Sequence, residues 1–316
     1  TLPDSKRYLL VPEGQPVPQG LDEDVSILQE PLQNIYLVAS GVMDMFASVD
    51  AVEQIRFSGQ KQENWYIQTA KDAMAAGDMI YAGKYSKPDY ELLVSEGCDL
   101  AIENRMITHS PEVVEMLQSF DIPVMIEYSS YEQHPLGKVE WVKFFGALTG
   151  REAEAEEAFA EQTEILEEVE SGEKTGKTIA FFYVTSNGLI QVRQSTDYIP
   201  KLIELAGGRY IFENLEDSGS GRSTLNMQVE DFYAGAKDAD ILIYNSSIDG
   251  GVTTVDELIG KCNILKDFKA VQEGQVYCTT NDMYQQSMAI GYLLQDMHTV
   301  LTDDDTAKLR YLFLLQ

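Results

Sequence analysis

Hydrophobic and polar positions alternate in blocks along this chain. Short, continuous apolar runs separate longer stretches in which apolar residues recur every three or four positions. In the first half the apolar runs are IYLVAS (35–40), QIRF (54–57), MIYA (79–82), DLAIE (99–103) and PVMIE (123–127). Runs of this kind predict strands buried on both faces of a parallel sheet. The stretches between and after them predict helices near 41–52, 63–76, 88–96, 110–120 and 137–148.

The second half repeats this plan. Its strand candidates are TIAFFYV (178–184), LIQVR (189–193), ILIYN (241–245) and QVYCT (275–279). Its predicted helices lie near 196–206, 228–237, 253–260, 263–271 and 284–301, with a last amphipathic stretch at 303–315. Alternating strands and helices in both halves predict an α/β protein with two Rossmann-like lobes built on central parallel sheets.

An acidic helix is predicted between the two halves, over residues 151–172 (REAEAEEAFAEQTEILEEVESG). Thr149 and Glu152 have the spacing of a capping box, and Gly172 is a suitable stop. One narrow stripe should face protein while the Glu side chains face water; it consists of Ala155, Phe159, Gln162, Leu166 and Val169. We expect a single spine helix that limits the lobes to small rocking motions about a ligand cleft.

Four segments follow from this organisation. Residues 1–30 are rich in Pro, Gly and acid and predict a tether followed by a first strand or loop. The N-terminal lobe is expected over 31–148, the spine helix over 149–172 and the C-terminal lobe over 173–316. The chain starts at Thr1 without a signal peptide, as a processed secreted protein or any trimmed chain would.

Charge and composition narrow the function. The net charge of −29 argues against binding to nucleic acid and against adhesion to anionic membranes, because a protein needs Lys and Arg side chains for either interaction. No apolar run is long enough to span a membrane. Cys98, Cys262 and Cys278 are an odd number without metal-ligand spacing, so buried thiols are expected, with a Cys262–Cys278 disulfide left open.

Enzyme signatures are missing from the sequence. It contains no phosphate-binding glycine loop, no H-E-x-x-H and no G-x-S-x-G motif. The three histidines are His109, His134 and His298, too few and too scattered for a His-rich metal site. Catalytic triads are spatial rather than sequential, so this absence lowers the expectation of an enzyme without excluding one.

Ligand chemistry is expected after each strand, because ligands bind outside the carboxyl ends of strands in such sheets. Half of the eight Arg residues lie at strand ends or in the following loops, among them Arg105, Arg193 and Arg222. Guanidinium groups bind carboxylate, phosphate or catecholate oxygens, so the group favours an anionic or oxygen-rich ligand. The alternative is that each Arg pairs with an acidic residue. The same segments hold candidate walls for a partly apolar ligand, namely Met43, Trp65, Tyr85 and Tyr284.

Several longer segments together resemble the substrate-binding proteins of ABC importers for iron–siderophore, haem and cobalamin. They are PDYELLVSEGCDLAI (88–102), DIPVMIE (121–127), HPLGKVEWVKFFGALTGREAEAE (134–156), QVRQSTDYIPKLIELAGGRYIF (191–212), VEDFYAGAKDADILIYN (229–245) and FKAVQEGQVYCT (268–279). The resemblance implies two lobes joined by one helix, and an acidic residue on each lobe that docks on the permease. Those positions match Glu91 and Glu230, for which the alternative is an ordinary first-turn Glu stabilised by the helix dipole.

This resemblance implies a monomeric, non-enzymatic protein outside the cell that delivers a metal chelate to an ABC permease. No cofactor or protein metal site is expected, and the lipid anchor of a cell-surface or periplasmic lipoprotein would lie outside the sequence given. Two other classes stay open. A tetrapyrrole metal chelatase also has two α/β lobes, and its cleft His could be His109 or His134. A surface scaffold or adhesin would bind no ligand in a cleft.

Overall fold

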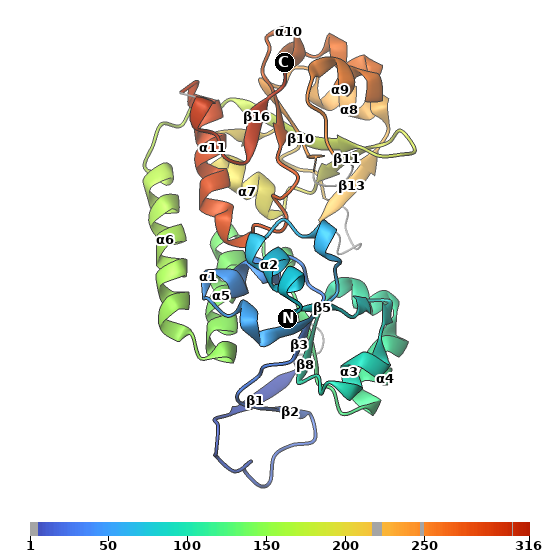
Figure 1. The fold of residues 1–316 in the computed structure, drawn as a ribbon. Helices are drawn as coiled ribbons and strands as arrows, with labels where there is room; N and C mark the ends of the chain where they lie inside the picture. Colours follow the sequence, from blue (N-terminus) through green and yellow to red (C-terminus); the bar gives the residue numbers. More distant parts are fainter. Residues whose placement is uncertain (1–5, 217–222, 247–249, 305) are drawn as a thin grey trace. The chain divides into compact units, whose positions relative to one another are not determined.

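The computed structural model describes residues 6–216, 223–246, 250–304 and 306–316, and it divides into two compact units (Figure 1). Unit 1 comprises Thr1–Tyr128 and Trp141–Phe159, and unit 2 comprises Ser129–Glu140 and Ala160–Gln316. The division therefore falls inside two helices, α5 (Pro135–Thr149) and α6 (Glu152–Glu170). The lobe boundaries expected from the sequence stay a proposal.

Unit 1 is built on the five-stranded parallel sheet that its apolar runs predict. The strand order is β5-β4-β3-β8-β9, with β3 (Ile35–Leu37), β4 (Ile55–Ser58), β5 (Ile80–Tyr81), β8 (Leu100–Asn104) and β9 (Val124–Glu127). The helices are α1 (Val42–Ser48), α2 (Gln68–Ala76), α3 (Tyr90–Ser95) and α4 (Pro111–Ser119). Leu93 of α3 and Leu117 of α4 pack on one face of the sheet, around Tyr36 and Ala101.

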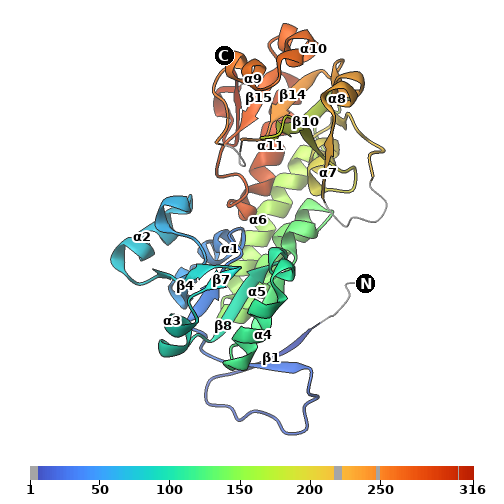
Figure 2. The same cartoon turned by 90° about the vertical axis from the view of Figure 1, so that its right-hand side faces the viewer.

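Residues 6–30 contain two strands, in the part of the chain where the sequence predicted a tether followed by a first strand or loop. Strands β1 (Arg7–Val11) and β2 (Val25–Gln29) form a separate two-stranded parallel sheet (Figure 2). The hydroxyl of Tyr8 donates to the carbonyl of Val124 at 2.9 Å, which attaches this sheet to unit 1. A small hairpin, β6 (Gly83–Lys84) and β7 (Lys87–Pro88), also belongs to unit 1. Gly83 has φ 91°, and a Cβ there would lie 2.3 Å from the carbonyl oxygen of Lys87.

Unit 2 has a mixed sheet rather than the expected parallel one. Strands β10 (Thr178–Val184), β14 (Ile241–Tyr244) and β15 (Val276–Thr279) are parallel, and β12 (Arg209–Tyr210) adds to β10. The antiparallel pairs join β10 to β11 (Ile190–Arg193), β11 to β13 (Thr224–Met227), and β15 to β16 (Leu312–Leu314). For β10 and β11 the physical reason is the length of the connection, because a turn of a few residues permits a hairpin but not a helical crossover.

The helices of unit 2 are α7 (Tyr198–Leu205), α8 (Val229–Ala236), α9 (Val255–Lys261), α10 (Lys269–Gln272) and α11 (Ile290–Thr302). Phe232 of α8 and Leu258 of α9 share one core cluster with Phe182 of β10 and Tyr244 of β14. Short 3-10 turns complete the described chain: η1 (Val52–Gln54), η2 (Gln62–Asn64), η3 (Arg105–His109), η4 (Ser129–Tyr131), η6 (Asn263–Asp267), η7 (Ser287–Ala289) and η8 (Thr306–Lys308). No helix in these ranges is both long enough and apolar enough to cross a membrane.

The helical prediction for 303–315 is wrong, because this segment ends in strand β16. The buried carboxylate of Asp296 on α11 accepts from the backbone N–H groups of Arg310 (2.9 Å), Tyr311 (2.6 Å) and Leu312 (3.0 Å). These bonds hold residues 310–312 in place, and β16 then pairs with β15.

Replacing Asp296 with Ala is expected to destabilise unit 2 by about 3 kcal/mol, because three backbone donors would lose a charged acceptor in a buried place. Urea unfolding followed by circular dichroism measures this loss. Asp231→Ala, an exposed change on α8, is the control and should change stability by less than about 0.5 kcal/mol. Equal stability of the two variants would contradict the anchoring role of Asp296.

The acidic helix matches its predicted stripe but not its predicted start. In α6, Ala155, Gln162, Leu166 and Val169 are buried while Phe159 is half-buried. The amide oxygen of Gln162 accepts from the backbone N–H of Gly291 at 2.8 Å, which explains a polar residue in the stripe. The capping box is wrong, because the hydroxyl of Thr149 donates to the carbonyl of Phe145 at 2.8 Å and so closes α5 instead.

The cysteines and two of the histidines have structural surroundings. All three cysteines are free thiols, so the optional Cys262–Cys278 disulfide is not formed. His298 on α11 bonds through Nδ1 to the carbonyl oxygen of Ala206 at 2.9 Å. The Nδ1 atom of His134 accepts from the backbone N–H of Leu136 at 3.2 Å, in the first turn of α5.

Candidate functional site

Three side chains of unit 2 meet close to the carboxyl end of β14. Arg193 ends β11, Asn245 follows β14 directly, and Tyr284 lies in the segment after β15. The Tyr284 hydroxyl accepts from Nη2 of Arg193 and from Nδ2 of Asn245, the latter at 2.7 Å. Asp197 joins them as the ion-pair partner of Arg193. We call Arg193, Asp197, Asn245 and Tyr284 the edge cluster.

The charge of Arg193 is balanced within this cluster. Its side chain is almost fully buried, and Nη1 lies 3.4 Å from a carboxylate oxygen of Asp197. Burial alone would lower the pKa of Arg193, but Tyr284 and Asp197 outweigh it and raise that pKa. Burial also raises the pKa of Tyr284 to about 12, so at neutral pH this residue is an uncharged phenol. Asp197 is therefore the group that neutralises Arg193 at neutral pH.

Two further residues position Arg193. The hydroxyl of Tyr210 accepts from the backbone N–H of Arg193 at 3.0 Å and donates to its carbonyl at 2.8 Å. Asp197 also caps α7, since its other oxygen accepts from the backbone N–H of Ile199 at 3.0 Å. The guanidinium carbon lies 5.4 Å from the centre of the Tyr284 ring and 5.9 Å from that of Phe181. The group is thus fixed before any ligand arrives.

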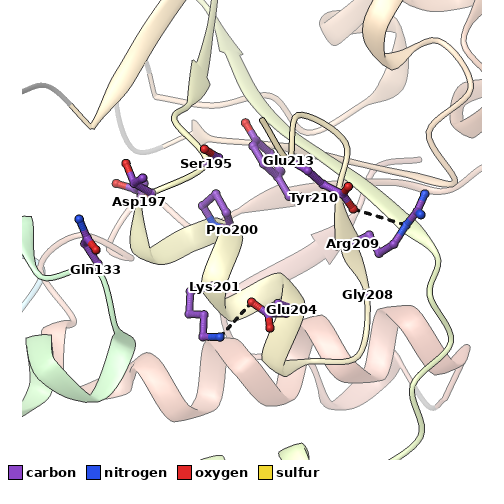
Figure 3. A pocket seen from close by; sticks show the side chains of 11 residues that line it. Gln133, Ser195, Asp197, Pro200, Lys201, Glu204, Gly208, Arg209, Tyr210 and Glu213 are labelled. Atoms are coloured by element: carbon purple, nitrogen blue, oxygen red, sulfur yellow. Dashed lines mark hydrogen bonds and ion pairs between the residues drawn. The ribbon is translucent and has the colours of Figure 1, made fainter. Parts of the chain in front are cut away.

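A hollow of about 400 Å³ lies in unit 2, and Asp197 of this cluster is part of its lining (Figure 3). Asp197 and Tyr210 line it, so the residues that hold Arg193 also face this hollow. Two ion pairs of partly exposed residues lie along it, Lys201–Glu204 at 2.9 Å and Arg209–Glu213 at 3.7 Å. Exposed pairs of this kind contribute about 0–1 kcal/mol, so they can exchange partners at little cost.

The predicted site residues of unit 1 are not equally accessible. Met43 and Trp65 are fully buried, and the indole N–H of Trp65 donates to the hydroxyl of Ser58 at 3.0 Å. Neither side chain presents a surface to a ligand as it stands. Tyr85 and Arg105 are half-buried and keep exposed surface. Arg222 lies outside the described residues.

Glu103 is a second notable residue of unit 1. It lies in β8, next to the strand's carboxyl end, and is fully buried, and neither carboxyl oxygen makes a hydrogen bond in the described part of the chain. Burial raises its pKa to about 8. This carboxyl does not hydrogen-bond to Arg105, which follows β8 directly.

The residues described here contain no group of three or more His, Cys, Asp or Glu side chains that could hold a metal ion. The polar groups at the edge of unit 2 are instead suited to hydrogen bonding, and its aromatic rings to apolar contact. Such a combination is typical of a site that binds a small molecule.

Comparison with known proteins gives the family. The family model described as periplasmic binding protein matches residues 44–283. The chain belongs to this family. An uncharacterized lipoprotein of Methanocaldococcus jannaschii is 25% identical over 316 residues, covering 94% of this periplasmic binding protein and 72% of the relative.

Solved structures agree with this assignment at the level of fold. One is a possible iron-binding (periplasmic solute-binding) protein from Staphylococcus epidermidis, with TM-score 0.65, 17% identity, and coverage of 85% of this chain and 98% of that chain. Another is the periplasmic haem-binding protein HutB of Vibrio cholerae, with TM-score 0.66, 14% identity, and coverage of 84% and 98%. At such identities the likeness establishes the fold of this periplasmic binding protein, two α/β lobes, and nothing finer.

The two acidic residues predicted to dock on a permease are exposed in this periplasmic binding protein. Glu91 lies in the first turn of α3, and Glu230 lies in the first turn of α8. Asp89 caps α3 by accepting from the backbone N–H of Leu92 at 3.1 Å, so the helix start that presents Glu91 is well defined. Their docking role stays a prediction.

Sequence reasoning selected Arg193 and Tyr284 but not the residues that join them. Asn245 lies within a segment marked for its position after a strand, and its place directly after ILIY was the available signal. Asp197 and Tyr210 carry no such signal. Their roles depend on contacts with Arg193, which is 4 positions from Asp197 and 17 positions from Tyr210 in the sequence.

Proposed function

We propose that this protein is the extracellular binding component of an ABC importer, and that it captures a metal chelate and delivers it to the permease. Membership of the periplasmic binding protein family supports solute binding, and solved structures with the same fold include iron- and haem-binding proteins. The observation that carries the proposal is the edge cluster, where Arg193, Asn245 and Tyr284 meet close to the carboxyl end of β14.

A location outside the cytoplasmic membrane follows from the same argument. The family is described as periplasmic, and a relative is named a lipoprotein. We propose attachment to the cell surface or residence in a periplasm, with Arg193 and Tyr284 in unit 2 and Tyr85 and Arg105 in unit 1 as the ligand-contacting residues. Met43 and Trp65 would support this site from the core.

The chelatase alternative is less well supported. It depended on His109 and His134 in a cleft, and the family of the chain is one of binding proteins. His134 already accepts a hydrogen bond from the first turn of α5. An assay of metal insertion into a porphyrin separates the two functions, because a binding protein catalyses none.

Ligand capture is tested by thermal unfolding with a panel of ferric siderophores, haemin, cyanocobalamin and simple oxyanions. A ligand present at a hundred times its dissociation constant should stabilise the protein by about 2.7 kcal/mol. Arg193→Gln should abolish most of this stabilisation, whereas Arg310→Gln leaves the edge cluster intact and serves as the control. If no chelate changes the unfolding temperature, the proposed function is wrong.

Permease docking is tested by reversing the two acidic charges. Glu91→Lys and Glu230→Lys should reduce delivery to reconstituted permease by about tenfold together while leaving chelate affinity unchanged, because opposite charges steer and orient the partners. Glu115→Lys, an exposed change on α4, is the control. The docking role would be contradicted if both variants lost chelate affinity and the reduction in delivery were no larger than that loss of affinity explains.

A further inference from the structure

Two lysines of unit 1 lie directly opposite each other in the hairpin of β6 and β7. The register of this hairpin pairs Lys84 with Lys87 across a turn made by Tyr85 and Ser86. Both lysine side chains are exposed. Side chains that are opposite in this way leave the same face of the strand pair, with Cβ atoms about 4.5–5.5 Å apart. Both ammonium groups can therefore reach one small group in solution.

Neither lysine has a partner within the protein. In the part of the chain that the structure describes, four Lys or Arg side chains make no ion pair, hydrogen bond or contact with an aromatic ring, namely Lys6, Lys84, Lys87 and Lys266. Two of these four belong to the hairpin, although the chain has 52 acidic residues for 23 basic ones. Like charges directly opposite each other destabilise a strand pair. The hairpin thus keeps an unfavourable positive pair that no described side chain neutralises by contact.

The backbone of the hairpin is anchored to the core of unit 1. The hydroxyl of Tyr36, a fully buried residue of β3, donates to the carbonyl of Gly83 at 2.8 Å. The backbone N–H of Asp89 donates to the carbonyl of Ala82 at 2.8 Å and closes the base of the hairpin. The N–H of Ala82 in turn donates to the carbonyl of Ser58 at 3.0 Å. Both lysines therefore start from a fixed backbone, which lowers the entropic cost of binding a ligand.

The position of the hairpin in the sheet is one where ligands bind. It follows the carboxyl end of β5. Tyr85, which is proposed above to contact the ligand, lies in its turn and is half-buried. Tyr81, the last residue of β5, is 41% exposed and is not part of the core that a strand position would suggest. Aromatic surface and two free cations are thus present within a few residues of each other.

We propose that Lys84 and Lys87 together bind one anionic group at the periphery of the chelate, such as a carboxylate, and so select anionic chelates over neutral ones. Ammonium groups bind carboxylate oxygens through charge-assisted hydrogen bonds, and this pair has no ion pair to break first. The net charge of −29 opposes the approach of an anion, so an anionic ligand needs a local cationic contact. This inference rests on the proposed function and narrows its ligand class.

Matched ligands test the charge preference directly. Haemin and haemin dimethyl ester share one macrocycle and differ in the charge of the propionate groups. The monocarboxylic acids of cyanocobalamin carry a carboxylate where cyanocobalamin has an amide. Anionic ferric enterobactin and neutral ferrichrome extend the contrast to siderophores. Calorimetric titration should give the anionic member of each pair that binds an affinity about tenfold or more above that of the neutral member.

Variants of the two lysines test the assigned contact. Lys84→Gln/Lys87→Gln should weaken the anionic member about tenfold or more and leave the neutral member unchanged, because Gln removes both charges. Lys84→Arg/Lys87→Arg keeps both charges and should keep the preference. Lys266→Gln removes an exposed, unpartnered cation from η6 in unit 2 and is the control. The Gln pair relieves a like-charge repulsion, so its unfolding temperature should be equal to or above that of the parent protein.

The outcomes separate this inference from the proposed function. If the anionic and neutral members bind equally, or if the Gln pair keeps the preference of the parent protein, the lysines are not the contact while chelate capture stands. If the Gln pair reduces delivery to the permease without changing chelate affinity, the lysines contact the permease instead and the inference is wrong. If no chelate binds, the proposed function fails and this inference fails with it.

Discussion

Replacing Glu103 with Gln is expected to stabilise unit 1 by roughly 3 kcal/mol at pH 7. The wild-type carboxyl is fully buried and makes no hydrogen bond within the described residues. Its pKa is raised by burial from 4.5 to about 8 in the folded protein. Folding at neutral pH therefore requires a proton that the unfolded chain does not hold, and Gln removes this requirement without changing the side-chain shape.

The pH dependence follows from the same shift. Below about pH 4.5 the carboxyl is protonated in both states and costs nothing. Between pH 4.5 and 8 the folded state binds more protons than the unfolded state, so wild-type stability falls as pH rises through this window. Above about pH 8 the difference is constant. The neighbouring Tyr36 and Tyr90 do not offset it, because burial raises the pKa of both.

The measurement can be confined to unit 1. The chain has two Trp residues, Trp65 and Trp141, and both belong to this unit, so tryptophan fluorescence reports its unfolding alone. Urea unfolding at pH 5 and pH 8 should show a large pH effect in the wild type and little in Glu103→Gln. Glu115→Gln removes the same charge from an exposed position and is the control. An unchanged pH slope in Glu103→Gln would show that another group is responsible.

Replacing Arg193 with Met is expected to destabilise unit 2 by about 3–5 kcal/mol, because removing one member of a buried ion pair leaves the other charge uncompensated. Asp197 is buried and would lose its ion-pair partner. Tyr284 would also lose a donor. The loss should exceed what the removed packing alone explains.

A second substitution separates charge from packing. In Arg193→Met/Asp197→Asn no unpaired charge remains, and Asn still caps α7 through its amide oxygen. We expect the double variant to recover about 2 kcal/mol relative to Arg193→Met, a coupling that a double-mutant cycle measures. Circular dichroism follows both units and tryptophan fluorescence follows unit 1 alone, so the change should appear in the circular dichroism transition while the fluorescence transition stays unchanged as an internal control. Additive losses would mean that Arg193 and Asp197 are not coupled.

Most strands were predictable because they are buried on both faces. IYLVA (35–39) and ILIY (241–244) are apolar throughout, a pattern that surface strands rarely show. The sheet of unit 2 was predicted less well, because strand direction depends on connection length and not on apolar content. The segment 303–315 failed for another reason. Its apolar spacing fits a helix and a short strand equally, and a distant carboxylate, Asp296, decides between them.

The candidate site was predictable where position after a strand was enough. Arg193 and Tyr284 were found in this way, and they contact one another. Trp65 was selected by the same rule but is fully buried, because Ser58, at the end of its own strand, accepts the indole hydrogen bond. Sequence shows that an aromatic residue lies in a loop, but it does not show whether the loop folds back on the core.

The division inside α5 and α6 has a consequence for how the protein can be taken apart. Neither unit is a continuous stretch of chain, since residues 129–140 belong with unit 2 and residues 141–159 with unit 1. No single truncation yields either unit whole, and an isolated unit would have to be assembled from two fragments or a rejoined chain. During synthesis, unit 1 lacks its last helical segment until residue 159 has left the ribosome, so a ribosome paused before that point would carry an incomplete core.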